Sequence, residues 1–190
     1  MQEIRKYIES YVSLSGTDWE QISATLEMVY VKKDTILLEE GKICRYLYFL
    51  ESGLMRFFIV KDGKDSTKFF TDAPFCFTSQ VSFTKGLPAQ ENIEALEDSV
   101  IWQMPVDKAN QLLQIRAWSD FVRILIQQVQ SYTEAILEEL QTVTAEERYR
   151  TMLMKEPQLV QRIPLKHLAS FLGIAPQSLS RIRKQLSKAK

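Results

Sequence analysis

The end of the chain holds the pattern that most restricts the fold. Residues 162–186 contain two short apolar runs at helical spacing, separated by Gly173. The first run is Leu165, Leu168, Ala169 and Leu172, and the second is Leu179, Ile182 and Leu186. Glycine ends helices readily because it adopts the left-handed conformation, and proline suits a first helical turn, where Pro176 stands. The pattern predicts two short helices joined by a tight turn, a helix-turn-helix.

The distribution of charge supports a contact between this segment and nucleic acid. The whole chain has 24 Lys+Arg and 24 Asp+Glu. Its last 34 residues carry seven basic and no acidic side chains, whereas the first 156 residues carry 17 basic and 24 acidic ones. A basic region on an acidic body is typical of a surface that meets phosphate. A solvated C-terminal helix and a purely structural helical hairpin are the alternatives.

The second helix of this motif predicts which side chains reach DNA. Its apolar face is committed to packing, so Gln177, Ser178 and Arg181 are predicted to contact base edges. Glutamine can pair with adenine, and arginine can form two hydrogen bonds with guanine. Basic residues beyond them are predicted to contact phosphates: Lys166, Arg183, Lys184 and Lys188.

Residues 35–105 have the short, turn-separated segments of β structure. The β-prone segments are 35–39, 46–51, 54–60, 66–71, 75–78, 91–96 and 100–104. Many short strands at this spacing predict a sandwich, roll or barrel rather than βαβ units. Residues 1–30 are predicted to be helical, with a second helix that begins near Thr17 and Asp18.

Residues 106–140 return to a helical period without an interrupting proline or glycine. Apolar residues recur there with alternating gaps of four and three, the spacing of a coiled-coil seam. The predicted dimer interface consists of Val122, Ile126, Val129, Thr133, Ile136 and Leu140. Packing of this helix on its own sheet is the alternative. A capping box from Thr144 to Glu147 predicts one further helix, which Pro157 ends.

The composition argues against several classes of function. Two cysteines, Cys44 and Cys76, and one histidine, His167, are too few for a typical zinc site, so we expect no metal and no cofactor. Without a cluster of histidine and carboxylate ligands, we expect no enzyme. No apolar run is long enough to span a bilayer and no signal peptide is evident, so we expect a cytoplasmic protein without membrane contact. Each cysteine is either a small core side chain or a redox sensor.

Three short motifs accompany the predicted β region and helix-turn-helix. They are Glu40-Gly41 before a strand, the Ser52-Gly53 turn with Leu54 to Arg56 after it, and Leu179-Ser-Arg181 in the last helix. With them, nearly the whole chain resembles the Crp/Fnr family of bacterial transcription regulators.

The resemblance implies an α+β fold in three parts. A double-stranded β-helix, or jelly roll, of the cyclic-nucleotide-binding type would comprise residues 1–117. A long dimerisation helix would comprise residues 118–142, and a helix-turn-helix without a full wing residues 143–190. The resemblance also implies a homodimer that binds a palindromic operator in double-stranded DNA, responds to an unknown small-molecule effector and contacts RNA polymerase.

The expected effector pocket departs from the family pattern. In members that bind cyclic nucleotide, an arginine neutralises the cyclic phosphate, whereas the corresponding residues 73–82 and 88–93 contain no arginine. A carboxylate at this place, Glu91, would repel a phosphodiester. We therefore expect that cyclic AMP does not bind. The effector pocket candidates are Phe77, Thr78, Ser79, Gln90, Glu91, Asn92 and Thr133. The alternative function is a degenerate sensor or scaffold without specific DNA binding.

Overall fold

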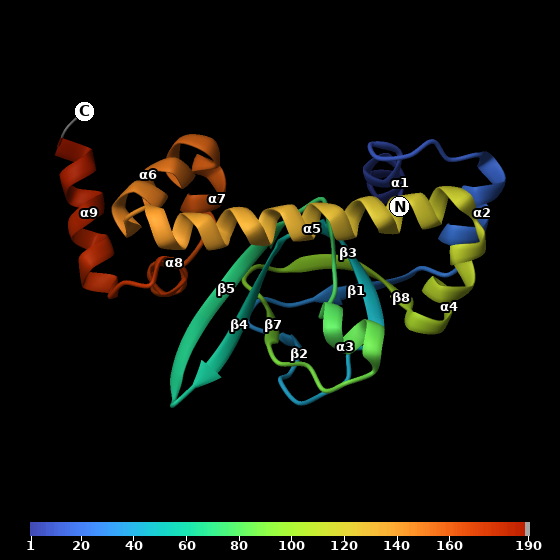
Figure 1. The fold of residues 1–190 in the computed structure, drawn as a ribbon, viewed down its shortest axis with the longest axis horizontal. Coiled ribbons are helices and arrows are strands. Elements are labelled where there is room, and N and C mark those ends of the chain that lie inside the picture. Colours follow the sequence, from blue (N-terminus) through green and yellow to red (C-terminus); the bar gives the residue numbers. More distant parts are fainter. Residues whose placement is uncertain (189–190) are drawn as a thin grey trace. The chain divides into compact units, whose positions relative to one another are not determined.

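The computed structural model describes residues 1–188, with side chains described as far as Leu186. Contacts divide the chain into two compact units, whose elements are labelled in Figure 1. The first unit comprises Met1–Phe57 and Phe70–Ser131, and the second comprises Phe58–Phe69 and the residues from Tyr132 onward. The predicted boundaries after residues 117 and 142 stay a prediction.

Strands form two four-stranded sheets in the described residues. The first sheet has the order β1 (Glu27–Val31), β8 (Ser99–Pro105), β3 (Tyr46–Ser52) and β6 (Phe75–Phe77). The second has the order β2 (Ile36–Leu38), β7 (Asn92–Ala95), β4 (Leu54–Lys61) and β5 (Lys64–Asp72). Their crossed strand order is that of a β-roll, which confirms the predicted α+β fold class.

The central strand β3 separates two apolar layers because successive side chains point to opposite faces. Leu47 and Phe49 belong to the buried cluster that also contains Trp118 of the long helix. Tyr48, on the other face, stacks on Phe77 with ring centroids 5.2 Å apart. The strand ends at a turn that requires Gly53, because φ is +109° there and a Cβ atom would lie 2.0 Å from the hydroxyl oxygen of Ser99.

The helices of the first unit precede, interrupt and follow the strands. They are α1 (Gln2–Glu9), α2 (Gly16–Ser23), α3 (Gln80–Lys85), α4 (Val106–Gln111), the 3₁₀ turn η1 (Leu112–Gln114) and the start of α5 (Arg116–Thr142). The helical assignment of residues 1–30 is wrong at its end, because Glu27–Val31 is strand β1 and pairs with β8. α2 begins at Gly16, one residue before Thr17, with Ser15 as its N-cap in a capping box with Asp18.

The helical segment over residues 106–140 is not one helix, since it contains α4, η1 and most of α5. It breaks after η1, where Ile115 has an extended conformation. The indole nitrogen of the buried Trp118 donates to the carbonyl oxygen of Ala109 at 3.1 Å and so satisfies a carbonyl in the last turn of α4. The chain therefore breaks between α4 and α5 without a proline or glycine, and this hydrogen bond spans the break.

The second unit contains the tip of the β4–β5 hairpin, the end of α5 and four further helices. These are α6 (Ala145–Lys155), α7 (Pro157–Arg162), α8 (Leu165–Leu172) and α9 (Pro176–Lys188). The predicted capping box is present, since the hydroxyl of Thr144 accepts from the amide of Glu147. None of the helices in residues 1–188 is both long and apolar enough to cross a membrane.

Candidate DNA-binding surface and effector pocket

Helices α8 and α9 pack through the apolar faces that the sequence predicts. Ala169 and Leu172 of α8 are buried, and so is Leu179 of α9. Gly173 has φ +73°, and the amide of Ile174 donates to the carbonyl oxygen of Ala169, which closes the turn. The two helices and their turn confirm the helix-turn-helix geometry.

The opposite face of α9 carries the residues predicted to read bases. Gln177 and Arg181 are exposed and Ser178 is half-buried, all in the first two turns of the helix. The Arg181 guanidinium donates to the hydroxyl oxygen of Ser178 at 3.4 Å. The structure thus brings Ser178 and Arg181 together, and the side chain of Arg181 has no other described hydrogen bond to break before it contacts a ligand.

The residues predicted to contact phosphates lie in different surroundings. Lys166 and Lys184 are exposed, as a phosphate contact requires. Arg183 is half-buried, with its guanidinium carbon 5.7 Å from the centre of the buried Tyr149 ring. Arg183 therefore packs against α6, and its phosphate contact stays a prediction. The side chain of Lys188 lies outside the described residues.

Sequence reasoning missed a second arginine that supports the motif. Arg148 of α6 donates from its guanidinium to the carbonyl oxygen of Leu172 at 2.6 Å, at the C-terminal end of α8. Unpaired carbonyls at a helix C-terminus accept such bonds favourably. No local sequence signal identifies this contact, because the two residues are 24 positions apart.

The predicted effector residues of the first unit make contacts among themselves and with neighbouring loops. The Ser79 hydroxyl donates to the Glu91 carboxylate at 2.6 Å, and the Thr78 hydroxyl donates to the carbonyl oxygen of Tyr46 at 2.9 Å. The Asn92 side chain accepts from the amide of Glu40.

The remaining candidates occupy other environments. Gln90 is exposed, and Phe77 is buried against Tyr48 and, edge to face, Phe57. Thr133 belongs to the second unit. The structure therefore brings together Ser79 and Glu91 but not the full predicted set. The role of these residues as an effector pocket stays a prediction.

Comparisons with known proteins agree with this architecture. Residues 28–116 match the family model of the cyclic nucleotide-binding domain. A Crp/Fnr-family protein from Eubacterium rectale has 20% sequence identity and a TM-score of 0.73, covering 93% of this chain and 85% of its own. The chain has the Crp/Fnr fold. No curated protein matches it in sequence.

Two further solved structures are similar in fold to this chain, at comparable sequence identity. FixK2 from Bradyrhizobium japonicum has 17% identity and a TM-score of 0.73, covering 86% of this chain and 85% of its own. The c-di-GMP-responsive global regulator CLP from Xanthomonas campestris has 17% identity and a TM-score of 0.68, covering 92% and 93%. At these identities the likeness shows the fold alone and not the ligand.

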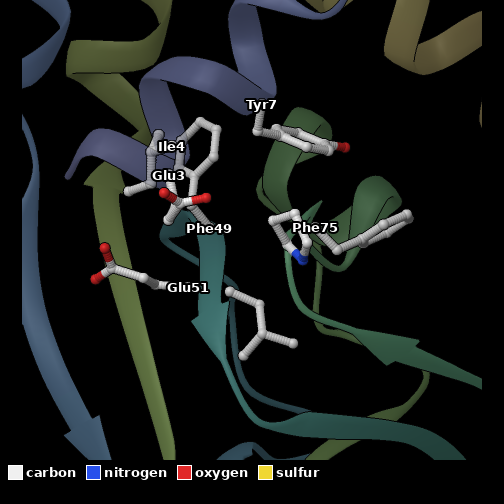
Figure 2. A pocket seen from close by; sticks show the side chains of 8 residues that line it. Glu3, Ile4, Tyr7, Phe49, Glu51 and Phe75 are labelled. Atoms are coloured by element: carbon white, nitrogen blue, oxygen red, sulfur yellow. The ribbon is translucent and has the colours of Figure 1, made fainter. Parts of the chain in front are cut away.

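One depression in the Crp/Fnr roll is too small for a ligand. Figure 2 shows side chains from α1, including Tyr7, together with Phe49, Glu51 and Phe75 around it. It has no space for a water-sized molecule. Although burial raises the pKa of Glu51, hydrogen bonds from the Met1 ammonium group and the Trp102 indole hold it below its ordinary value. These contacts give Glu51 a structural role.

Proposed function

We propose that this chain is a sequence-specific DNA-binding transcription regulator that acts as a homodimer. The observation that carries the proposal is the exposure of Gln177 and Arg181 on a helix whose other face is buried, in a basic segment of the chain. Side chains in the first turns of such a helix are placed to reach base edges in the major groove. Regulators that share the fold support the same function. Its site of action would be the cytoplasm, and contact with RNA polymerase remains part of the proposal.

The long helix α5 provides the proposed dimer interface. Val122 packs against the core of the first unit, so this part of the seam is already covered within the protomer. Further along, Ile126, Val129 and Leu140 are 48%, 44% and 56% exposed. Apolar residues repeated along one helix stripe are stable in water when a second helix covers them. A second copy of α5 supplies that cover.

The proposed regulator does not respond to cyclic AMP. The carboxylate of Glu91 is fixed beside Ser79, and the segment that would carry the phosphate-binding arginine has none. A carboxylate near a cyclic phosphate is repulsive, and the repulsion grows where water is excluded. Any effector of this chain is therefore expected to be a different small molecule.

The experiment that tests this function compares two single variants on selected and random duplex DNA. Arg181→Ala is expected to weaken binding to the selected operator by about 1 to 3 kcal/mol and to relax preference at one base pair of each half-site. Lys184→Ala is expected to weaken binding to both DNAs alike and to reduce the salt slope by about one. Half-sites are expected about 10 base pairs apart, because two recognition helices enter successive major grooves.

Two outcomes would contradict the proposal. Equal losses on both DNAs for Arg181→Ala would remove this residue from base recognition. If the wild-type protein shows no salt-dependent binding to any duplex, the chain is a sensor or scaffold instead, since phosphate contacts necessarily release counterions.

A further inference from the structure

A cavity of about 370 Å³ opens in the first unit between β2, the following loop and β3. None of the predicted effector residues lines it. Small-molecule sites in proteins start at roughly 300 Å³, so its size suits a compact ligand of one or two rings.

The lining of this cavity includes both aliphatic and aromatic side chains. Ile36 and Ile43 are 38% and 45% exposed, so they present apolar surface that a ligand would cover. Tyr46 and Tyr48 form the aromatic wall, with ring centroids 6.0 Å apart. Tyr48 is buried and held by its stack on Phe77, so this wall is in place before a ligand arrives.

The charged groups of the cavity favour a singly charged anion. Lys42 and Arg45 line it with one carboxylate, that of Glu39, which leaves an excess of one positive charge. Among the described residues, neither the Lys42 ammonium nor the Arg45 guanidinium has an ion-pair or hydrogen-bond partner. Arginine can bind a carboxylate through two parallel hydrogen bonds. Two unpaired cations beside an aromatic wall match a planar ring that carries a carboxylate.

We propose that this cavity binds a small aromatic carboxylate. The ring lies against Tyr46 and Tyr48, and the carboxylate is bound by Arg45 and Lys42. The site is distinct from the place where the family resemblance puts a cyclic nucleotide. Its existence does not depend on DNA binding, so it goes beyond the proposed function.

Hydrogen bonds tie the loop of this cavity to the segment that holds the predicted effector residues. The amide of Cys44 donates to the hydroxyl oxygen of Ser82 in α3 at 2.8 Å. Two further hydrogen bonds connect the loop to Ala89. The Gly41 amide donates to the carbonyl oxygen of Ala89, and the Ala89 amide donates to the carbonyl oxygen of Lys42, each at 2.8 Å. The loop of the cavity is therefore connected to this segment at Ser82 and Ala89.

The test is calorimetric titration of the full chain with 1-naphthoate. We expect saturable binding with a Kd below about 1 mM, and at least tenfold weaker binding of the neutral isostere 1-naphthamide. Arg45→Gln and Lys42→Gln are each expected to weaken 1-naphthoate binding about fivefold or more. Lys61→Gln, which removes an exposed cation elsewhere in the chain, is the matched control and is expected to change nothing. Unchanged thermal midpoints show that the variants are folded.

Several results would overturn this site. Absence of saturable heat, equal affinity for the neutral isostere, or unchanged affinity in the Arg45→Gln and Lys42→Gln variants would each do so. None of these results bears on DNA binding, which is measured separately. A parallel titration with cyclic AMP concerns only the regulator proposal, where a Kd at or below about 10 μM would contradict the interpretation of Glu91.

Discussion

Burial decides what chemistry the two cysteine thiols can perform. Cys76 lies in the same apolar cluster as Phe49 and Trp118, and burial raises the pKa of its thiol. Cys44 is also buried, with its sulfur 3.3 Å from the hydroxyl oxygen of Thr78. Burial limits access to both sulfurs, and the raised pKa of Cys76 also lowers its fraction of reactive thiolate, so a core role is favoured over redox sensing.

We predict that Cys76 is protected from alkylation in the folded protein. In a Cys44→Ser variant, iodoacetamide at pH 8 is expected to modify Cys76 at least about 100-fold more slowly than in denaturant, because the raised pKa lowers the thiolate fraction and burial blocks access. The rate should rise as the pH increases. Mass spectrometry of timed samples measures it, and modification at the denatured rate in native buffer would identify an accessible, reactive thiol instead.

Individual side chains could be predicted where one helix determines their direction. The period of 3.6 residues places Gln177 and Arg181 opposite Leu179, and the structure has this arrangement. The surroundings of Arg183 could not be predicted in this way, because its contact with Tyr149 depends on how α6 packs beside α9. The aromatic and cationic lining of the 370 Å³ cavity likewise comes from the folding of a loop against a strand, which no local spacing reveals.

At the scale of elements, turn residues made most strands predictable. The strands from β3 to β5 are separated by glycine-containing turns, and their predicted ranges match to within two residues. Strand β1 was missed because only its end is buried and its partner, β8, is about 70 residues away. The break before α5 contains neither proline nor glycine, so no turn residue in the sequence marks it.

The tip of the β4–β5 hairpin is bound to helix α8 by one serine. The hydroxyl oxygen of Ser170 accepts from the amide of Thr67 at 2.9 Å, and the hydroxyl donates to the carbonyl oxygen of Asp65 at 3.2 Å. Thr67 is buried in the described structure. This serine therefore joins two segments of the second unit that lie more than 100 positions apart in sequence.

Ser170→Ala is predicted to lower the free energy of unfolding by about 1 to 2 kcal/mol, because it removes two hydrogen bonds at a partly buried position. Hydrogen exchange at the Thr67 amide should become faster. Urea denaturation and exchange measured by NMR test the two effects. Ser180→Ala, an exposed serine of α9, is the matched control; if the two variants are equally stable, the Ser170 contact contributes nothing measurable.

At the scale of the whole molecule, the sequence left two partners open for the long helix. Trp118, Phe121 and Val122 show that the first turns of α5 pack in the core of the first unit. Of the seam residues that follow, Ile126, Val129 and Leu140 are about half exposed in the described protomer. A single chain cannot reveal its oligomeric partner by periodicity alone, because the same spacing serves a sheet face and a second helix.

The dimer prediction rests on side chains that are about half exposed in the protomer, so they can be changed without damaging its core. Val129→Asp combined with Leu140→Asp is expected to convert a dimer into monomers of 22.1 kDa, because a dimer would place four carboxylates in one apolar seam. Sedimentation equilibrium measures the mass. Ser131→Asp, an exposed position on the other side of α5, adds a charge outside the seam and should leave the dimer intact. If the double variant sediments as the wild-type dimer does, the chains pair through a different surface. If it becomes monomeric and still binds random duplex DNA weakly while losing the palindromic preference, specific recognition requires two copies of α9 held together by α5.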